Sequence, residues 1–319
     1  GGTAVGVAPD AMWISAKIFD DAGVTSVSKV HQAFQWVLDP DNNPATPDFP
    51  NVVNNSWSFA TPGCDLQFQP DLQALRALNI LPVFAAGNAG PSASTDESPA
   101  NNPGAFAVGA VNNLDAIYGP SSRGPSACGQ SAHTFPDVVA PGVAINTTDT
   151  FGGYYNPTGT SLAAPHVAGG VAVLLSTRPW LSPAQLEDAL RGTAIDLGDL
   201  GPDNSFGYGR IDLLAAYQAL LTLPTPTPTD TPTLTSTATP TPTATSTSTP
   251  TATSTAAPGL AGDANCDGLV TMTDALMIGR YVVGLAQALP CPQNADITGD
   301  GQIAMTDALA IARLVVGVP

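Results

Sequence analysis

Apolar positions in the first part of this chain follow two kinds of pattern. In residues 26–38 they repeat at the three- and four-residue spacing that is typical of an amphipathic helix. Residues 182–190 predict a second helix, because Ser182 suits an N-cap and Pro183 suits the first helical position. A further helix is expected over residues 211–221.

Other apolar runs are continuous. The run that begins near Pro82 is typical of a buried strand and ends in a Gly-rich turn at residues 87–90. The run Val167–Leu175 has helical character, and Ser161 stands just before it, behind a Gly-Thr turn. Unpaired N–H groups and the positive end of the helix dipole meet at such a position and favour developing negative charge. Ser161 is therefore a candidate nucleophile, and the alternative is an ordinary N-capping serine.

The composition changes abruptly at Pro224. Residues 224–258 are almost entirely Thr, Pro, Ser and Ala, a composition that cannot bury enough apolar surface to fold. Proline-rich segments of this kind favour extended polyproline II structure. The sequence therefore predicts two folded parts, residues 1–223 and 259–319, joined by a disordered Thr/Pro-rich linker.

The tail contains an internal duplication. Residues 263–274 recur as residues 296–307, and both copies run into apolar helices. Side-chain oxygens at loop positions 1, 3, 5 and 12, with glycine at position 6, are the pattern of calcium-binding loops, because a hard cation needs several oxygen ligands. Position 12 is Asp in both copies, where EF-hands have Glu, and no entering helix precedes either loop. Asp-Gly turns that cap helices are the alternative.

Charge narrows the classes of function. The formal net charge is −17 and the sequence pI is about 4.1, and the only lysines are Lys17 and Lys29. These values leave no basic patch for nucleic acid and oppose binding to an anionic membrane surface. No continuous apolar run approaches the roughly 20 residues that span a bilayer, so membrane insertion is not expected.

The four cysteines divide two and two. Cys64 and Cys128 lie in the first folded part, and Cys266 and Cys291 lie in the tail. Four cysteines allow three pairings. We favour one bridge in each part, which is consistent with export from the cell, and free buried thiols are the alternative.

Several segments resemble subtilisin-like serine proteases, and most closely their bacillopeptidase F-like branch. Residues 159–169 resemble the family's serine box, residues 83–90 its oxyanion segment, and residues 52–58 the strand that pairs with substrate. Further landmarks of the family are matched by residues 121–125 and 139–143. The resemblance covers residues 1–220 and implies an α/β fold, with a mostly parallel sheet and flanking helices, that is truncated at its N-terminus.

The resemblance also implies roles for particular residues. Ser161 would be the nucleophile, and Asn88 would donate its side-chain amide to the anionic tetrahedral intermediate, next to the Ser161 N–H. The alternative for Asn88 is an ordinary turn residue. The implied substrate-binding residues are Ser56, Trp57, Ser58, Ala86 and Gly87. Their side chains do not by themselves indicate which substrate residue is preferred.

The family's catalytic base and its partner are not found in this sequence. Serine-triad catalysis needs a His to take the serine proton and an Asp to orient that His, yet the family's Asp box and His-Gly-Thr-His box are absent. Residues 6–11 resemble the segment after the His box, so we expect the sequence to begin just past the catalytic His, as a fragment. None of His31, His133 and His166 has a matching context. We therefore expect negligible peptidase activity from the 319-residue chain alone.

The tail resembles the dockerin type I domain over residues 259–319, both in its duplicated loops and in its departures from an EF-hand. The resemblance implies a small all-α domain with two calcium sites and calcium-dependent folding. By loop position, the ligands are Asp263, Asn265, Asp267, the Leu269 carbonyl, Thr271 and Asp274 in the first site, and Asp296, Thr298, Asp300, the Gln302 carbonyl and Asp307 in the second. The second site is expected to bind more weakly, because Thr298 replaces Asn and Ala304 offers no side-chain oxygen.

Dockerins bind cohesin modules, so the resemblance implies a cohesin partner on a scaffold or cell surface. The Met-Thr pairs at residues 272–273 and 305–306 occupy positions that help to select the cohesin in that family. The favoured hypothesis is a secreted, extracellular serine endopeptidase that cuts polypeptides and is tethered through its dockerin. One alternative is a non-catalytic scaffold or adhesion protein with a subtilisin-like pseudoenzyme domain. Another makes the dockerin the main functional unit.

Overall fold

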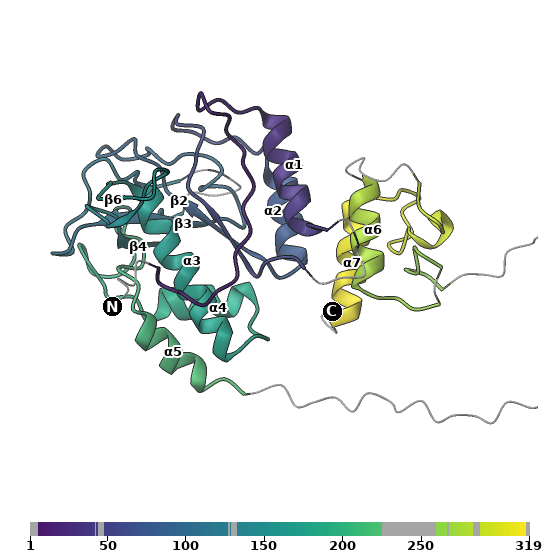
Figure 1. Cartoon of the computed structure of the whole chain (residues 1–319). Helices are drawn as coiled ribbons and strands as arrows, with labels where there is room; N and C mark the ends of the chain where they lie inside the picture. Colours follow the sequence, from purple (N-terminus) through teal and green to yellow (C-terminus); the bar gives the residue numbers. More distant parts are fainter. Residues whose placement is uncertain are drawn as a thin grey trace, which may run out of the picture. The chain divides into compact units, whose positions relative to one another are not determined.

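The computed structural model describes two compact units, Gly1–Leu223 and Pro224–Pro319 (Figure 1). The described residues are 6–41, 43, 48–126, 128, 133–224, 260–266, 268–282 and 288–316. The predicted linker, apart from Pro224, lies outside them.

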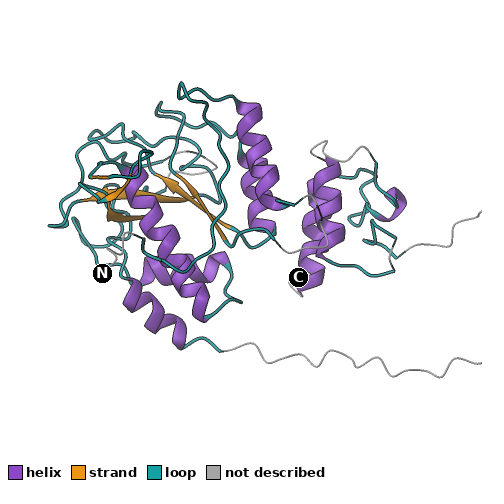
Figure 2. Cartoon of the chain, viewed as in Figure 1, coloured by secondary structure: helices purple, strands orange, loops and turns teal. Residues whose placement is uncertain are grey.

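The first unit is built on a four-stranded parallel sheet (Figure 2). The strands, in order across the sheet, are β1 (Val52–Asn55), β2 (Leu81–Ala85), β3 (Phe106–Val111) and β4 (Val138–Pro141). Neighbouring strands are consecutive in the sequence, and Val83 lies in register with Phe106. Because all four strands run the same way, their carboxyl ends meet at one edge of the sheet. The predicted α/β fold with a mostly parallel sheet is confirmed.

Helices cover both faces of this sheet. One face carries α1 (Val27–Leu38) and α2 (Gln69–Ala77), and the other carries α3 (Thr160–Thr177), α4 (Pro183–Gly192) and α5 (Leu213–Leu221). Successive side chains of a strand point to opposite faces. Val83 therefore joins the core beneath α3 to α5, whereas Phe84 joins the core beneath α1 and α2. A short antiparallel hairpin, β5 (Thr147–Thr148) with β6 (Tyr154–Tyr155), precedes α3.

α3 is the main helix of its layer. Its buried side chains include Val167, Val171 and Leu174, which pack against the sheet. By length and composition alone this helix is apolar enough to cross a membrane. Its packing is that of a core helix in a globular domain, because such helices are apolar on the sides that they bury.

The helices predicted for this unit are present, with one shift at an end. α1 begins directly after Ser26, which caps it, and Ser182 caps α4 in a complete capping box. α5 begins at Leu213 instead of Ile211, because the Asp212 side chain accepts from a backbone N–H of the first turn and caps the helix there.

Both predicted disulfides are present, and each lies within one unit. The Cα atoms of Cys64 and Cys128 are 4.9 Å apart, and those of Cys266 and Cys291 are 5.9 Å apart. No cysteine of the described residues is free.

The second unit is a small helical domain. Its elements are α6 (Met272–Val282), the 3₁₀ turn η1 (Pro292–Asn294) and α7 (Met305–Val316). The two long helices pack together through Ile278 and Ile311, both fully buried. Each of the duplicated loops leads directly into one of these helices.

Candidate functional sites

Ser161 is the second residue of α3 and is held against the segment that follows β1. Its hydroxyl donates to the Ser56 carbonyl oxygen at 3.4 Å, and the Ser56 hydroxyl donates to the Ser161 carbonyl oxygen at 2.8 Å. Gly159, just before the helix, has a φ of +156°, which L side chains rarely adopt. This turn places the Ser161 hydroxyl at the positive end of an 18-residue helix.

Asn88 follows β2 and faces the same helix N-terminus. Its Oδ1 accepts from the Thr160 N–H at 3.1 Å and from the Thr160 hydroxyl at 3.2 Å. Asn88 is exposed. Because its Oδ1 accepts these two hydrogen bonds, its Nδ2 remains available as a donor among the described residues. A Cβ added at Gly159 would lie 3.8 Å from the Ser161 nitrogen and 3.9 Å from Asn88 Nδ2. The same point lies 3.6 Å from Asn88 Oδ1, so both polar atoms of the Asn88 amide and the Ser161 N–H surround Gly159.

Residues 56–58 continue from the carboxyl end of β1. The Trp57 ring packs edge-on against Phe68 and Phe84, with centroids 5.5 and 5.8 Å away. Its Nε1 donates to Asn55 Oδ1 at 3.2 Å. These contacts fix the segment, because an aromatic ring with a satisfied N–H and tight packing has one favoured orientation.

Residues 86–88 form the facing segment at the carboxyl end of β2. Ala86 and Gly87 are buried, and the Gly87 φ of +105° turns the chain toward Asn88. The Gly87 carbonyl oxygen accepts from the Thr160 hydroxyl at 3.2 Å. The structure thus brings Ser161, Asn88, residues 56–58 and residues 86–87 together at one edge of the sheet.

Glu97 also belongs to this region, although no sequence pattern marked it. Its carboxyl group accepts from the Ser58 hydroxyl, and a Cβ added at Gly87 would lie 2.6 Å from the Glu97 Cδ. Glu97 comes from a separate segment, whose backbone at Ser98 accepts from the Phe59 N–H at 2.9 Å. Only the folded chain shows that this residue touches both candidate substrate segments.

The three histidines are engaged elsewhere. His31 Nδ1 lies 2.8 Å from Asp71 Oδ2, and His166 Nδ1 lies 2.8 Å from the Leu162 carbonyl oxygen. His133 is exposed, and its backbone pairs with Ser126. Within the described residues, the Ser161 hydroxyl therefore meets the Ser56 carbonyl and no histidine ring.

The His31–Asp71 pair is buried at its acidic end. Burial raises the pKa of Asp71 from 3.8 to about 6, and the charge of His31 and its hydrogen bond offset only part of this rise. The pair joins α1 to the first turn of α2, so it belongs to the packing of these two helices.

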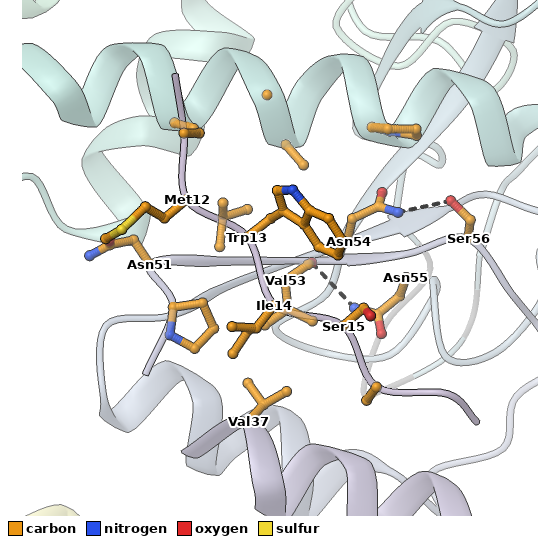
Figure 3. A pocket seen from close by; sticks show the side chains of 18 of the residues that line it. Met12, Trp13, Ile14, Ser15, Val37, Asn51, Val53, Asn54, Asn55 and Ser56 are labelled. Carbon is orange, nitrogen blue, oxygen red and sulfur yellow. Dashed lines mark hydrogen bonds between the residues drawn. The ribbon is translucent and has the colours of Figure 1, made fainter. Parts of the chain in front are cut away.

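A cavity of about 1420 Å³ adjoins the candidate site along β1, an end strand of the sheet. It is lined by most residues of the segment 6–19, by β1 and by residues of α1 and α3, and it reaches Ser56. Figure 3 shows Trp13 on the α3 side of the extended N-terminal segment and Ile14 on the α1 side. Because Trp13 and Ile14 are exposed, the cavity has an apolar, solvent-accessible wall.

In the first duplicated loop, the carboxylate at position 12 folds back over the loop. Asp274 is fully buried, and its Oδ1 accepts from the N–H groups of Ala264 and Asn265 at 2.9 and 3.1 Å. Its Oδ2 accepts from the Thr271 N–H at 2.9 Å. Asp263, at position 1, accepts from the Gly268 N–H at 3.0 Å. Asp267 lies outside the described residues.

The second loop repeats these hydrogen bonds at the equivalent positions. Asp307 accepts from the N–H groups of Thr298 and Ala304 at 3.0 and 2.8 Å, and Asp296 accepts from the Gly301 N–H at 2.8 Å. Burial raises the pKa of Asp307, but hydrogen bonds from Ala304 and Thr298 outweigh it and hold the pKa below its usual value. Both loops are therefore anionic turns closed by a buried aspartate.

The donor set of these loops fits a hard cation. Every predicted side-chain ligand is an oxygen donor, and the position-6 glycines, Gly268 and Gly301, have φ values of +87° and +84° that allow the sharp turn. Asp300 Oδ1 accepts from the Gln302 N–H at 2.9 Å, as expected for a tight turn of this kind.

Comparison with known families gives two matches. Residues 1–209 match the family model described as the Subtilase family, and residues 261–315 match that described as the Dockerin type I domain. Together the matches account for nearly all of the chain outside the linker.

Curated relatives resemble the first unit. Bacillopeptidase F of Bacillus subtilis (strain 168) is 35% identical over 230 residues, which are 68% of this chain and 16% of the relative. Subtilisin E of the same strain is 37% identical over 218 residues, 67% of this chain and 51% of the relative. Subtilisin of Bacillus pumilus is 35% identical over 218 residues, 67% of this chain and 70% of the relative. The chain thus spans only 16% and 51% of the first two relatives.

Among solved structures, the prenylagaramide maturation protease PagA has a similar fold. The TM-score is 0.53 at 24% sequence identity, covering 64% of this chain and 71% of that one. At this identity the likeness concerns the fold alone.

Proposed function

This chain belongs to the subtilase family, and from that premise we propose that it serves as an extracellular serine endopeptidase tethered through its dockerin domain. The observation that supports the peptidase function most is the meeting of Ser161 and Asn88 at the N-terminus of α3. There the Asn88 amide and the Ser161 N–H lie around the same residue, Gly159, close to the serine hydroxyl.

Each group has a role in peptide hydrolysis under this proposal. Ser161 Oγ attacks the scissile carbonyl carbon, and the negative oxygen that results accepts hydrogen bonds from Asn88 Nδ2 and the Ser161 N–H. The substrate backbone lies along residues 56–58, where main-chain pairing gives affinity with little sequence choice. Residues 86–87 form the opposite side.

The proton of Ser161 needs a base, and the described residues offer no histidine beside it. We therefore propose that the 319 residues alone hydrolyse peptides at a negligible rate. The second candidate function is that of a dockerin-bearing scaffold or adhesion protein whose subtilase domain is a pseudoenzyme, and the complete reading frame distinguishes the two.

The test is casein hydrolysis by the secreted product of the complete reading frame that encodes this chain. Ser161→Ala should abolish it, by about 10⁶-fold as the equivalent change does in subtilisin. Asn88→Ala should lower turnover by about 10²- to 10³-fold, again the magnitude known for subtilisin. Hydrolysis that survives Ser161→Ala contradicts the proposed mechanism. Absence of hydrolysis in the unsubstituted product favours the pseudoenzyme.

We propose two calcium sites in the dockerin domain, held by the ligands predicted from loop position. Bound calcium would supply the positive charge that the clustered carboxylates of each loop require. Titration of the whole chain with CaCl₂ in a calorimeter should show two binding events, the weaker one in the second loop. Asp274→Asn should remove the tighter event and its match Asp307→Asn the weaker one. Two equal sites contradict the predicted order.

Export and tethering complete the proposal. The two disulfides support an oxidising, extracellular location, because such bridges are rare in the cytosol. A cohesin module is the proposed partner, with the Met-Thr pairs at residues 272–273 and 305–306 at its contact. Cohesin immobilised on resin should retain the chain in calcium buffer and release it in chelator. Retention that is unchanged in chelator contradicts calcium-dependent docking.

A further inference from the structure

Glu97 is a buried acidic residue without a cationic partner. Only 3% of its surface is exposed, and none of the ion pairs among the described residues includes it. Its carboxyl group accepts one side-chain hydrogen bond, from the Ser58 hydroxyl. A carboxylate has room for about four hydrogen-bond donors, so this one keeps most of its accepting capacity unused.

Glu97 lies between the two segments that the proposed function assigns to substrate. Ser58 belongs to the first segment and bonds to it directly. Gly87 belongs to the second segment, and a Cβ there would lie 2.6 Å from Glu97 Cδ and 2.7 Å from Glu97 Oε2. The carboxyl group therefore packs directly on the bare face of Gly87, and any side chain at position 87 would separate the two.

Both segments connect Glu97 to the nucleophile. The first contacts Ser161 through Ser56, with hydrogen bonds of 2.8 and 3.4 Å in opposite directions. The second contacts the residue before it, because the Thr160 hydroxyl donates to the Gly87 carbonyl oxygen at 3.2 Å. The Glu97 carboxyl group is thus linked to the nucleophile through both candidate substrate segments.

We propose that Glu97 makes this site select lysine or arginine on the N-terminal side of the scissile bond. The inference rests on the proposed function, since it takes residues 56–58 and 86–87 as the substrate segments. A buried carboxylate without a partner is costly. A guanidinium group relieves that cost with paired, charge-assisted hydrogen bonds. An apolar side chain leaves the carboxylate desolvated and unpaired, and an acidic one adds repulsion.

A purely structural role for Glu97 makes a different prediction. In that case the carboxyl group serves only to hold Ser58, and the charge has no effect on substrate. Glu97→Gln distinguishes the two roles, because the amide oxygen can still accept from Ser58 while the negative charge is gone. Asp199→Asn is the matched control, since it removes one negative charge from an exposed loop residue.

The experiment measures peptide binding to the 319-residue chain by fluorescence anisotropy. Two labelled heptapeptides are compared, identical except for arginine or its neutral isostere citrulline at the central position. We expect the arginine peptide to bind about 10- to 100-fold more tightly, the usual worth of a hydrogen-bonded charge. Glu97→Gln should abolish this preference, and Asp199→Asn should keep it.

Equal affinity for arginine and citrulline on the unsubstituted chain overturns the role of Glu97 and leaves the proposed function standing. A preference that persists in Glu97→Gln also overturns it, because the overall charge of −17 would then be the cause. If no peptide binds, the assignment of residues 56–58 and 86–87 as substrate segments is wrong, and both proposals fail.

A second comparison needs no variant and guards against misfolding of Glu97→Gln. On the unsubstituted chain, a glutamate peptide should bind more weakly than a glutamine peptide at the central position. This difference in affinity should shrink when the glutamate or glutamine is placed at the end of the peptide instead. If glutamate weakens binding equally at both positions, the repulsion does not come from a carboxylate next to the central residue.

Discussion

The two units of this protein are stabilised in different ways. Among its described residues, the peptidase unit buries 22 apolar residues on one face of its sheet and 12 on the other, so hydrophobic burial can stabilise it without a ligand. The described residues of the dockerin unit form one cluster of seven buried apolar residues, four of which are alanine. A core of that size rarely stabilises a domain alone, and a disulfide and bound metal are the usual supplements.

Buried acidic groups show the same contrast. In the peptidase unit, burial raises the pKa of Glu187, and Arg76 and Arg191 form ion pairs with it. In the dockerin unit, the buried Asp274 and Asp307 are satisfied by backbone N–H groups, and no ion pair of the described residues includes them. Glu187 is thus neutralised by arginines of its own unit, whereas Asp274 and Asp307 meet no cationic side chain among the described residues. Glu97 of the peptidase unit also lacks a cationic partner, as does the buried Asp96, whose Oδ2 accepts from the Asn101 amide and the Ser126 hydroxyl instead.

Calcium removal should have the largest effect and should separate the units. All four tryptophans, Trp13, Trp36, Trp57 and Trp180, lie in the peptidase unit, so their fluorescence reports on that unit alone. Chelator should unfold α6 and α7, seen as lost circular dichroism and lost amide dispersion, because calcium at 1,000 times its Kd adds about 4 kcal/mol per site. The tryptophan unfolding transition should not move.

Two outcomes of that experiment would contradict the view that the two units are stabilised in different ways. A tryptophan transition that shifts with chelator means that the peptidase unit also depends on calcium. Native amide dispersion of α6 and α7 in chelator means that seven buried residues and the Cys266–Cys291 bridge suffice.

The peptidase core should respond strongly to a cavity. Leu174 of α3 is 1% exposed, and Leu174→Ala should lower the free energy of unfolding by about 2–5 kcal/mol. Leu214→Ala is the matched control on a helix of the same layer, because Leu214 is 66% exposed and should change stability by less than about 0.5 kcal/mol. Urea unfolding followed by tryptophan fluorescence measures both. Equal losses for the two variants contradict the assignment of the core to this layer.

Local patterns were enough to predict much of this fold. The stripe in residues 26–38 and the cap at Ser182 depend on near neighbours in the sequence, and both were found where expected. The disulfide pairing was also right, because the chain changes composition between the two pairs. α2 (Gln69–Ala77) was not predicted, since only two of its side chains, Leu72 and Leu75, are buried and its stripe is short.

The candidate site contains residues that the sequence identified and one that it did not. Ser161 and Asn88 are part of recognisable segments, so their meeting could be expected. Glu97 could not, because its proximity to Ser58 and Gly87 depends on contacts between segments distant in the sequence. A polar stretch such as residues 94–102 gives no sign of which carboxyl group is buried.

The smallest predicted effect tests whether the acidic groups of the peptidase unit are costly when charged. Burial raises the pKa of Asp71 to about 6, above its ordinary value of 3.8. Protonated Asp71 therefore stabilises the folded state, fully below about pH 4, and that stability is lost as the pH rises through about 6. The difference is worth about 1–3 kcal/mol at most.

Asp71→Asn should remove this dependence, because the amide can still accept from His31 without carrying charge. The free energy of unfolding of the unsubstituted chain should fall between pH 4 and 6 relative to that of Asp71→Asn, when both are measured by urea titration in the same buffers. Parallel pH profiles would show that the charge of His31, 2.8 Å away, compensates the buried carboxylate fully. In that event Asp71, like Glu187, would be neutralised by a cationic side chain of its own unit.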